Sequence, residues 1–137
     1  MRAWLVGLAL AGLAGSAAAA EPCATPPGFT ARERLESAGV VVLYRTVPAA
    51  IELGRHFSVE AIVCDGRPGS VPGGLRIDAR MPEHRHSMNY RPRVSPAGGG
   101  RYLAEGLMFH MPGRWQLLFD VERGGRAERL ATDIVVE

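Results

Sequence analysis

The sequence predicts an all-β protein, an immunoglobulin-like β-sandwich of about seven antiparallel strands with a short N-terminal helix. Three observations support this fold class. Several segments alternate apolar and polar residues, as a strand with one buried face does. The 17 glycines and 10 prolines among 137 residues favour frequent turns and few long helices. Gly124-Gly125 stands between two alternating segments and is typical of a tight hairpin turn.

The alternation is clear in His56–Cys64, where Phe57, Val59, Ala61 and Val63 share one face. The segment Arg91–Ser95 contains Pro92 near its start and is followed by Pro96, which is typical of an edge strand. The predicted strands are Val40–Thr46, His56–Cys64, Leu75–Met81, Arg91–Ser95, Tyr102–Phe109, Trp115–Glu122 and Arg129–Val136. Together they make one domain over residues 40–137, which is enough chain for a single hydrophobic core.

Residues 1–20 have the pattern of a secretory signal peptide. Arg2 precedes the apolar stretch Ala3–Leu13, and small residues end the segment at Ala20. Cleavage there would start the mature chain at Glu21 and deliver it to the periplasm or the outside of the cell. The alternative is an uncleaved membrane anchor, since Ala3–Ala20 is just long enough to span a bilayer.

The segment 21–39 is predicted to be an N-terminal arm. Thr30-Ala31-Arg32-Glu33 fits a helix capping box, and Gly39 provides a stop. These signals predict the short helix, over Ala31–Ala38.

The two cysteines, Cys23 and Cys64, both fall in the expected mature chain. In an oxidising compartment such a pair predicts a disulfide, worth about 4 kcal/mol in the chain-entropy model. The alternative is a redox pair or thiolate metal ligands, although the spacing is not that of a Cys-x-x-Cys motif.

Charge and motifs exclude several classes of function. A net charge of +2 gives no broad basic surface, so we expect no nucleic-acid partner. The sequence has no nucleophile motif and no pair of carboxylates at catalytic spacing, so we do not expect an enzyme.

Histidine and methionine gather in two segments of the chain. The first contains Met81, His84, His86 and Met88, and the second contains Met108, His110 and Met111. Imidazole and thioether together select copper, with Cu(I) favoured over Cu(II), and the lack of a cysteine thiolate disfavours structural zinc. If 84–88 is extended, its alternate side chains share a face but lie too far apart for one ion, so a bend is needed. The alternative is that Met81, Met108 and Met111 only pack in the core.

These residues carry a resemblance to a known family. Met81-Pro82-x-His84-x-His86-x-Met88, followed by Met111-Pro112-Gly113-x-Trp115, resembles the YtkA-like domain, which is related to the FixH-like proteins. The resemblance covers about Val40 to Val136. It implies an immunoglobulin-type sandwich in an exported or anchored protein associated with copper handling or cytochrome oxidase assembly. It also implies His84, His86 and Met88 as ligands, with His110 as a further one.

The chain departs from this family in two ways. Ser87 stands where many relatives have glycine, and the N-terminus does not favour a membrane anchor.

The function predicted from the sequence is therefore a periplasmic copper-binding protein that acts as a carrier, chaperone or buffer. The predicted metal ligands are His84, His86, Met88, His110, Met81 and Met111. The partners would be the copper ion and a periplasmic or membrane copper protein, with membrane contact only if the signal stays uncleaved. The alternative function is a protein-interaction or structural module without metal, including an accessory factor in cytochrome oxidase assembly.

Overall fold

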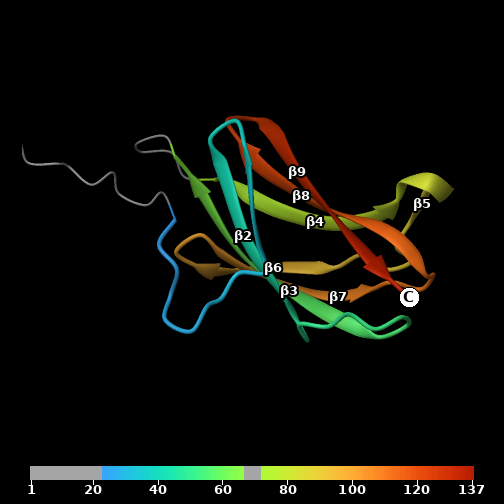
Figure 1. Cartoon of the computed structure of the whole chain (residues 1–137). Coiled ribbons are helices and arrows are strands. Elements are labelled where there is room, and N and C mark those ends of the chain that lie inside the picture. Colours follow the sequence, from blue (N-terminus) through green and yellow to red (C-terminus); the bar gives the residue numbers. More distant parts are fainter. Residues whose placement is uncertain (1–22, 67–71) are drawn as a thin grey trace, which may run out of the picture.

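The computed structural model describes residues 23–66 and 72–137, and in them the chain forms two facing antiparallel sheets (Figure 1). The first sheet has the order β1-β2-β3-β7-β6 and the second has the order β5-β4-β8-β9. The strands are β1 (Glu33–Ser37), β2 (Val40–Val47), β3 (His56–Asp65), β4 (Gly74–Met81), β5 (His86–Ser87), β6 (Arg93–Gly98), β7 (Arg101–Met108), β8 (Gly113–Arg123) and β9 (Arg126–Val136). The predicted all-β sandwich is confirmed at this level.

The core lies between the two sheets and is built from alternate residues of the long strands. Tyr44 of β2 packs on Phe119 of β8, with ring centroids 5.0 Å apart. At one end of the sandwich, Phe109 lies between Phe57 and Trp115 and stacks on the indole at 4.7 Å. This aromatic group is fully or almost fully buried. It forms the base on which the candidate site rests.

The helix predicted over Ala31–Ala38 is wrong, because this segment contains β1. Strand β1 pairs along its whole length with β2, and Ala38 and Gly39 form the turn between them at positive φ. Glu33, predicted as the last residue of a capping box, instead accepts hydrogen bonds from the hydroxyls of Tyr44 at 3.1 Å and Thr132 at 2.6 Å. Pairing with β2 in the same sheet and the bond to Thr132 of the other sheet outweigh the local helix signal.

The residues that the structure describes contain two strands beyond the seven that the sequence predicts. They are β1 and the two-residue β5. Each of the other seven overlaps its predicted range, and Gly124-Gly125 forms the predicted turn between β8 and β9 at positive φ.

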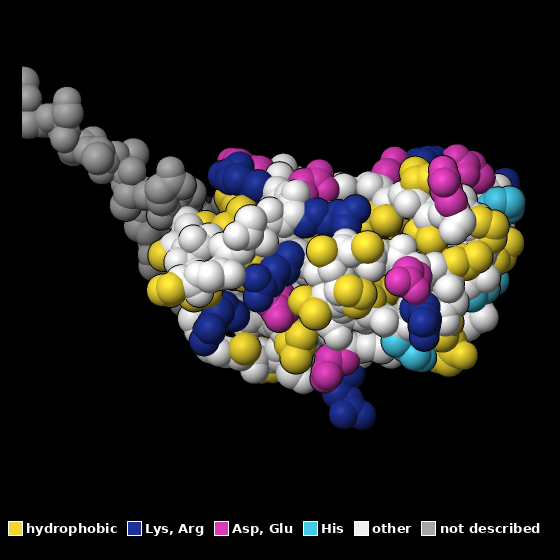
Figure 2. All heavy atoms as spheres, turned by 60° about the horizontal axis from the view of Figure 1, so that its bottom comes forward, with side chains coloured by type: hydrophobic (Ala, Val, Ile, Leu, Met, Phe, Trp, Pro, Cys, Tyr) yellow, Lys and Arg dark blue, Asp and Glu magenta, His cyan; other side chains and the backbone are white. Residues whose placement is uncertain are grey.

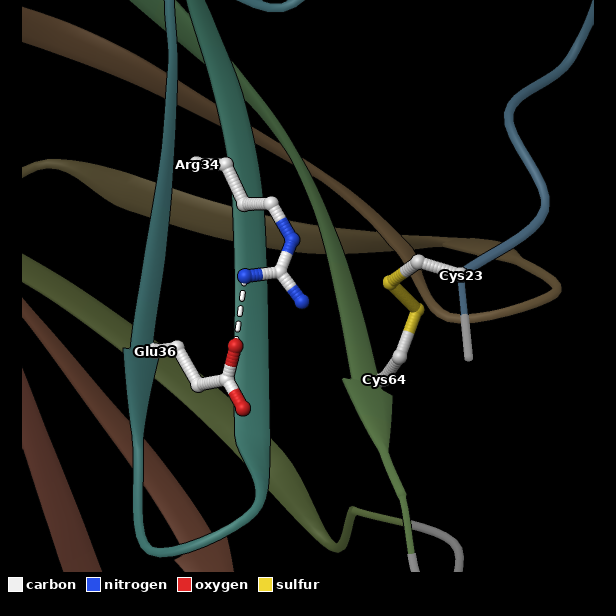
Figure 3. The surroundings of a disulfide bond; sticks show 4 residues. All are labelled: Cys23, Arg34, Glu36 and Cys64. Atoms are coloured by element: carbon white, nitrogen blue, oxygen red, sulfur yellow. Dashed lines mark hydrogen bonds and ion pairs between the residues drawn. A yellow bond between two sulfur atoms is a disulfide. The ribbon is translucent and has the colours of Figure 1, made fainter. Parts of the chain in front are cut away.

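The predicted disulfide between Cys23 and Cys64 is confirmed, with the two Cα atoms 5.5 Å apart (Figure 3). It holds the N-terminal arm at the end of β3. There the arm residues Phe29 and Ala31 pack on a second apolar cluster formed by Val41, Leu43 and Ile62. Strand β2 is consequently buried on both faces, which explains its continuous run of apolar residues.

The predicted signal peptide and its cleavage site lie outside the described residues. Within 23–66 and 72–137, the structure has no helix with the length and hydrophobicity that a membrane span requires.

Candidate metal site

The end of β4 and the start of β5 place three candidate side chains on one face of the second sheet. Pro82–His84 forms a single 3-10 turn (η1) after Met81, and Arg85 adopts a left-handed conformation with φ 50°. The chain then returns as β5, so that His86 pairs with Met81 and the amide of Met88 donates to the Ala79 carbonyl at 3.2 Å. Because side chains alternate along strands, Met81, His86 and Met88 lie on the same face. Met81 and Met88 are buried in the core cluster, and His86 is half-buried.

The second segment brings His110 to His86. The Nε2 atoms of the two imidazoles are 2.6 Å apart, and their rings meet edge to face with centroids separated by 4.7 Å. His110 follows β7 and rests against the indole of Trp115, at a centroid distance of 5.4 Å. Residues 24 positions apart in sequence therefore converge, as the sequence analysis requires of a shared site.

The segment after His110 is fixed by the same tryptophan. The indole Nε1 of Trp115 donates a hydrogen bond of 2.9 Å to the carbonyl of Met111. The side chain of Met111 is partly buried against the core cluster. Met108 is half-buried on β7 and pairs with His56 of β3. Met111 therefore follows His110 directly in the sequence, whereas Met108 is part of β7 in the first sheet.

His84 is placed differently from His86. It lies on η1 and is exposed, since the turn and the left-handed Arg85 interrupt the extended row. The chain therefore bends at η1 and Arg85, as a shared site for residues 84–88 would need. The bend leaves His84 exposed and does not bring it to His86. Figure 2 shows one face of the molecule, and the histidine side chains visible there gather at one end, among hydrophobic side chains.

An ion pair network holds η1 against the second sheet. Arg114 of β8 bonds to Glu83 of η1 at 3.0 Å and to Asp133 of β9 at 2.9 Å. The carboxylates of Asp133 and Glu83 raise the pKa of the Arg114 guanidinium above its usual value. The turn that carries His84 is therefore attached to both β8 and β9.

The donor set fits a soft metal ion better than a hard one. Two nitrogens bound at about 2.0 Å to one ion are about 2.8 Å apart at a right angle and about 3.3 Å apart at a tetrahedral angle. The observed 2.6 Å thus needs only a small separation of the rings. No group of three or more His, Cys, Asp and Glu side chains suited to a metal occurs within 23–66 and 72–137. The other candidate side chains on the face of His86 are the thioethers of Met81 and Met88.

One polar atom at this site is left without a partner. The Nδ1 atom of His110 is buried and makes no hydrogen bond to any residue that the structure describes. A buried imidazole nitrogen without a partner costs free energy. This atom is not the one that meets His86, because that contact is made by Nε2.

No family model and no curated protein matches the chain. The crystal structure of a DUF4426 family protein from Pseudomonas aeruginosa PAO1 is similar over 75% of this chain and 94% of that chain, with a TM-score of 0.45 and 16% sequence identity.

Proposed function

We propose that the protein is an exported copper-binding protein of immunoglobulin-like fold that holds Cu(I) between His86 and His110 and carries or buffers it. The observation that supports the proposal most strongly is the 2.6 Å approach of the two Nε2 atoms. A contact of this length is an N–H···N hydrogen bond when one of the two rings carries its proton on Nε2. When both rings carry the proton on Nδ1, the two Nε2 lone pairs face the same gap and can bind one ion after a small separation of the rings.

The neighbouring methionines favour Cu(I) among the metals that imidazole binds. Met81 and Met88 share the face of His86, and Met111 follows His110 directly. Thioethers bind Cu(I) and bind hard ions such as Mg²⁺ and Ca²⁺ poorly. We assign Met81 and Met88 as candidate inner ligands and leave Met111 and the exposed His84 as peripheral ones.

A carrier must release its metal to another protein, and the placement of the ligands agrees with that need. His86 and His110 are half-buried, so the pair is open to solvent on one side. The exposed His84 lies on the adjoining turn, where it could contact copper during transfer. The Cys23–Cys64 disulfide favours an oxidising compartment such as the periplasm, which agrees with an exported carrier.

A Cu(I) competition titration on the disulfide-intact protein tests the proposal. We expect one-to-one binding that His86→Ala and His110→Asn each weaken at least tenfold. His84→Ala should cost less, because His84 is exposed on η1. The matched control is His56→Ala, since His56 is also an exposed histidine but contacts Tyr90 and not the pair.

The triple variant of His84, His86 and Met88 should abolish the binding. Equal Cu(I) affinity in the native protein and the triple variant would contradict the proposal. Absence of binding in the native protein would favour the interaction module that the sequence analysis gives as the alternative.

A further inference from the structure

The second sheet has an edge that its own chain covers only in part. Strand β5 pairs with Arg80 and Met81 of β4, and the amide of Met88 adds one more bond to Ala79. If the chain stayed paired with β4 for two residues after Met88, Tyr90 would lie opposite Ile77. The chain instead leaves β4 after Met88 and crosses to β6 of the other sheet.

The hydrogen bonds of Ala79 show which main-chain groups this leaves open. Its carbonyl accepts from Met88, and its amide donates to the Asp78 carboxylate at 2.8 Å, so both groups of Ala79 face the β5 side. Main-chain groups alternate in direction along an antiparallel strand, so those of Ile77 and Leu75 face the same side. Among the described residues, β4 pairs only with β5 and β8, and neither of these two residues has a backbone partner on that side.

A cavity of about 670 Å³ lies along this open edge. Leu75–Asp78 of β4 lines it, together with Met88, Tyr90 and Val94. Val94 belongs to β6, the last strand of the first sheet, so the cavity occupies the flank where both sheets end. The apolar side chains around it provide a pocket beside a row of unpaired donors and acceptors.

The charged side chains that line the cavity are three arginines and two aspartates, Asp78 and Asp120. Two of the arginines, Arg129 and Arg76, donate to Asp120, Arg129 at 2.6 and 2.8 Å and Arg76 at 3.4 Å. Arg91 is exposed and forms no ion pair with the residues described.

We propose that the open edge of β4 at Leu75–Ile77 binds an extended acidic segment of a partner protein as an additional strand. Main-chain bonds to Leu75 and Ile77 would supply the pairing, and carboxylates of the segment would meet Arg91, which pairs with no described carboxylate. Such strand addition takes affinity from the backbone and specificity from alternate side chains. The proposal needs no metal, so it stands apart from the copper site.

A synthetic peptide of seven residues that alternates valine and glutamate is the probe. We expect it to bind the native protein and to slow the hydrogen exchange of the Leu75 and Ile77 amides. A peptide with lysine in place of glutamate, and one with the same sequence but N-methylated at alternate amides, should each bind at least tenfold more weakly. Arg91→Glu should weaken binding of the acidic peptide similarly, whereas Arg126→Glu, at an exposed arginine of β9, should not.

Three results would overturn the proposal. One is equal binding of the N-methylated peptide, which would mean that no strand is added. Another is displacement of the peptide by inorganic phosphate at equal concentration, which would mark a site for small anions. The third is protection of Leu75 and Ile77 in the protein alone as its concentration rises, which would assign the edge to a second copy of the chain.

Discussion

Gly113 lies against the end of the Met81 side chain, so that a Cβ atom at position 113 would be 3.0 Å from Met81 Cε. Gly113 also has φ +123°, a conformation that side-chain-bearing residues rarely adopt. This contact joins the first strand residue after the histidine segment to a proposed copper ligand. Close packing there fixes the position of the thioether.

Gly113→Ala should lower the free energy of unfolding by about 1–3 kcal/mol, because it adds backbone strain and a contact with Met81. Urea denaturation of the metal-free protein measures the loss. The matched control is Gly124→Ala, which also has positive φ but open space around the added Cβ. If part of the loss comes from the contact with Met81, Gly113→Ala will lower the free energy of unfolding by less in the Met81→Leu variant. Strictly additive effects of the two substitutions would contradict the contact.

Met81→Leu and Met88→Leu should each lower Cu(I) affinity while changing the unfolding free energy by less than about 1.5 kcal/mol. Leucine keeps the buried volume of methionine nearly constant but removes the thioether. Paired chelator titration and urea denaturation separate the two effects. Unchanged affinity in both variants would assign these methionines to core packing alone.

Loss of the disulfide should lower stability by about 2–4 kcal/mol, since Cys23 and Cys64 are 41 residues apart. Replacing both cysteines by serine should also free the arm and uncover Val41, Leu43 and Ile62. Urea denaturation and binding of a hydrophobic dye measure the two consequences. A reductant should lower the stability of the native protein and leave that of the double serine variant unchanged. A change in the stability of the variant would show that the reductant acts on something other than the disulfide.

Stability should fall above pH 10 through Tyr44. Burial, followed by the nearby Glu33 carboxylate, raises the pKa of Tyr44 to about 12. The fold therefore favours the neutral phenol, and its contribution is complete below pH 10 and lost as pH rises toward 12. We expect a loss of about 1–3 kcal/mol between these values. The phenolate absorbance of the native protein should show a late phase that Tyr44→Phe removes, and persistence of that phase in the variant would contradict the assignment.

Asp120 should provide stability that is lost in acid. Hydrogen bonds from Arg129 hold the pKa of this carboxyl below its usual range, against the effect of burial. A lowered pKa means that the contribution is present above the ordinary carboxyl pKa and disappears as pH falls through the lowered value. Asp120→Asn should cost about 1 kcal/mol at neutral pH and flatten the acid limb of stability against pH. A profile parallel to that of the native protein would contradict this role.

The sequence is most informative where one local rule decides the structure. Alternation fixes the faces of β3, β4 and β8, and the glycine pair fixes the turn before β9. It fails at β1, where a capping box competes with pairing to β2 and with hydrogen bonds from Tyr44 and Thr132. Strand β2 follows β1 directly, but Thr132 is 99 residues from Glu33, so no local pattern reports that contact.

The candidate site divides in the same way. Residue types predict that His86 and His110 belong together, and the structure brings them into contact. The outward position of His84 depends on η1 and on the left-handed Arg85, which is a rare conformation for arginine. Alternation along an assumed strand could not reveal that change of direction.

The cross-sheet hydrogen bonds of β1 have a consequence for motion. Glu33 bonds to Thr132, and Ser37 bonds to Glu128, so one flank of the sandwich is fastened between β1 and β9. The opposite flank, between β4 and β6, is spanned by the connecting chain after Met88. Local opening should therefore begin at that flank, with amide exchange there faster than in β2 or β8. His86 lies on β5 at this flank, so its contact with His110 belongs to the side of the sandwich that should open first.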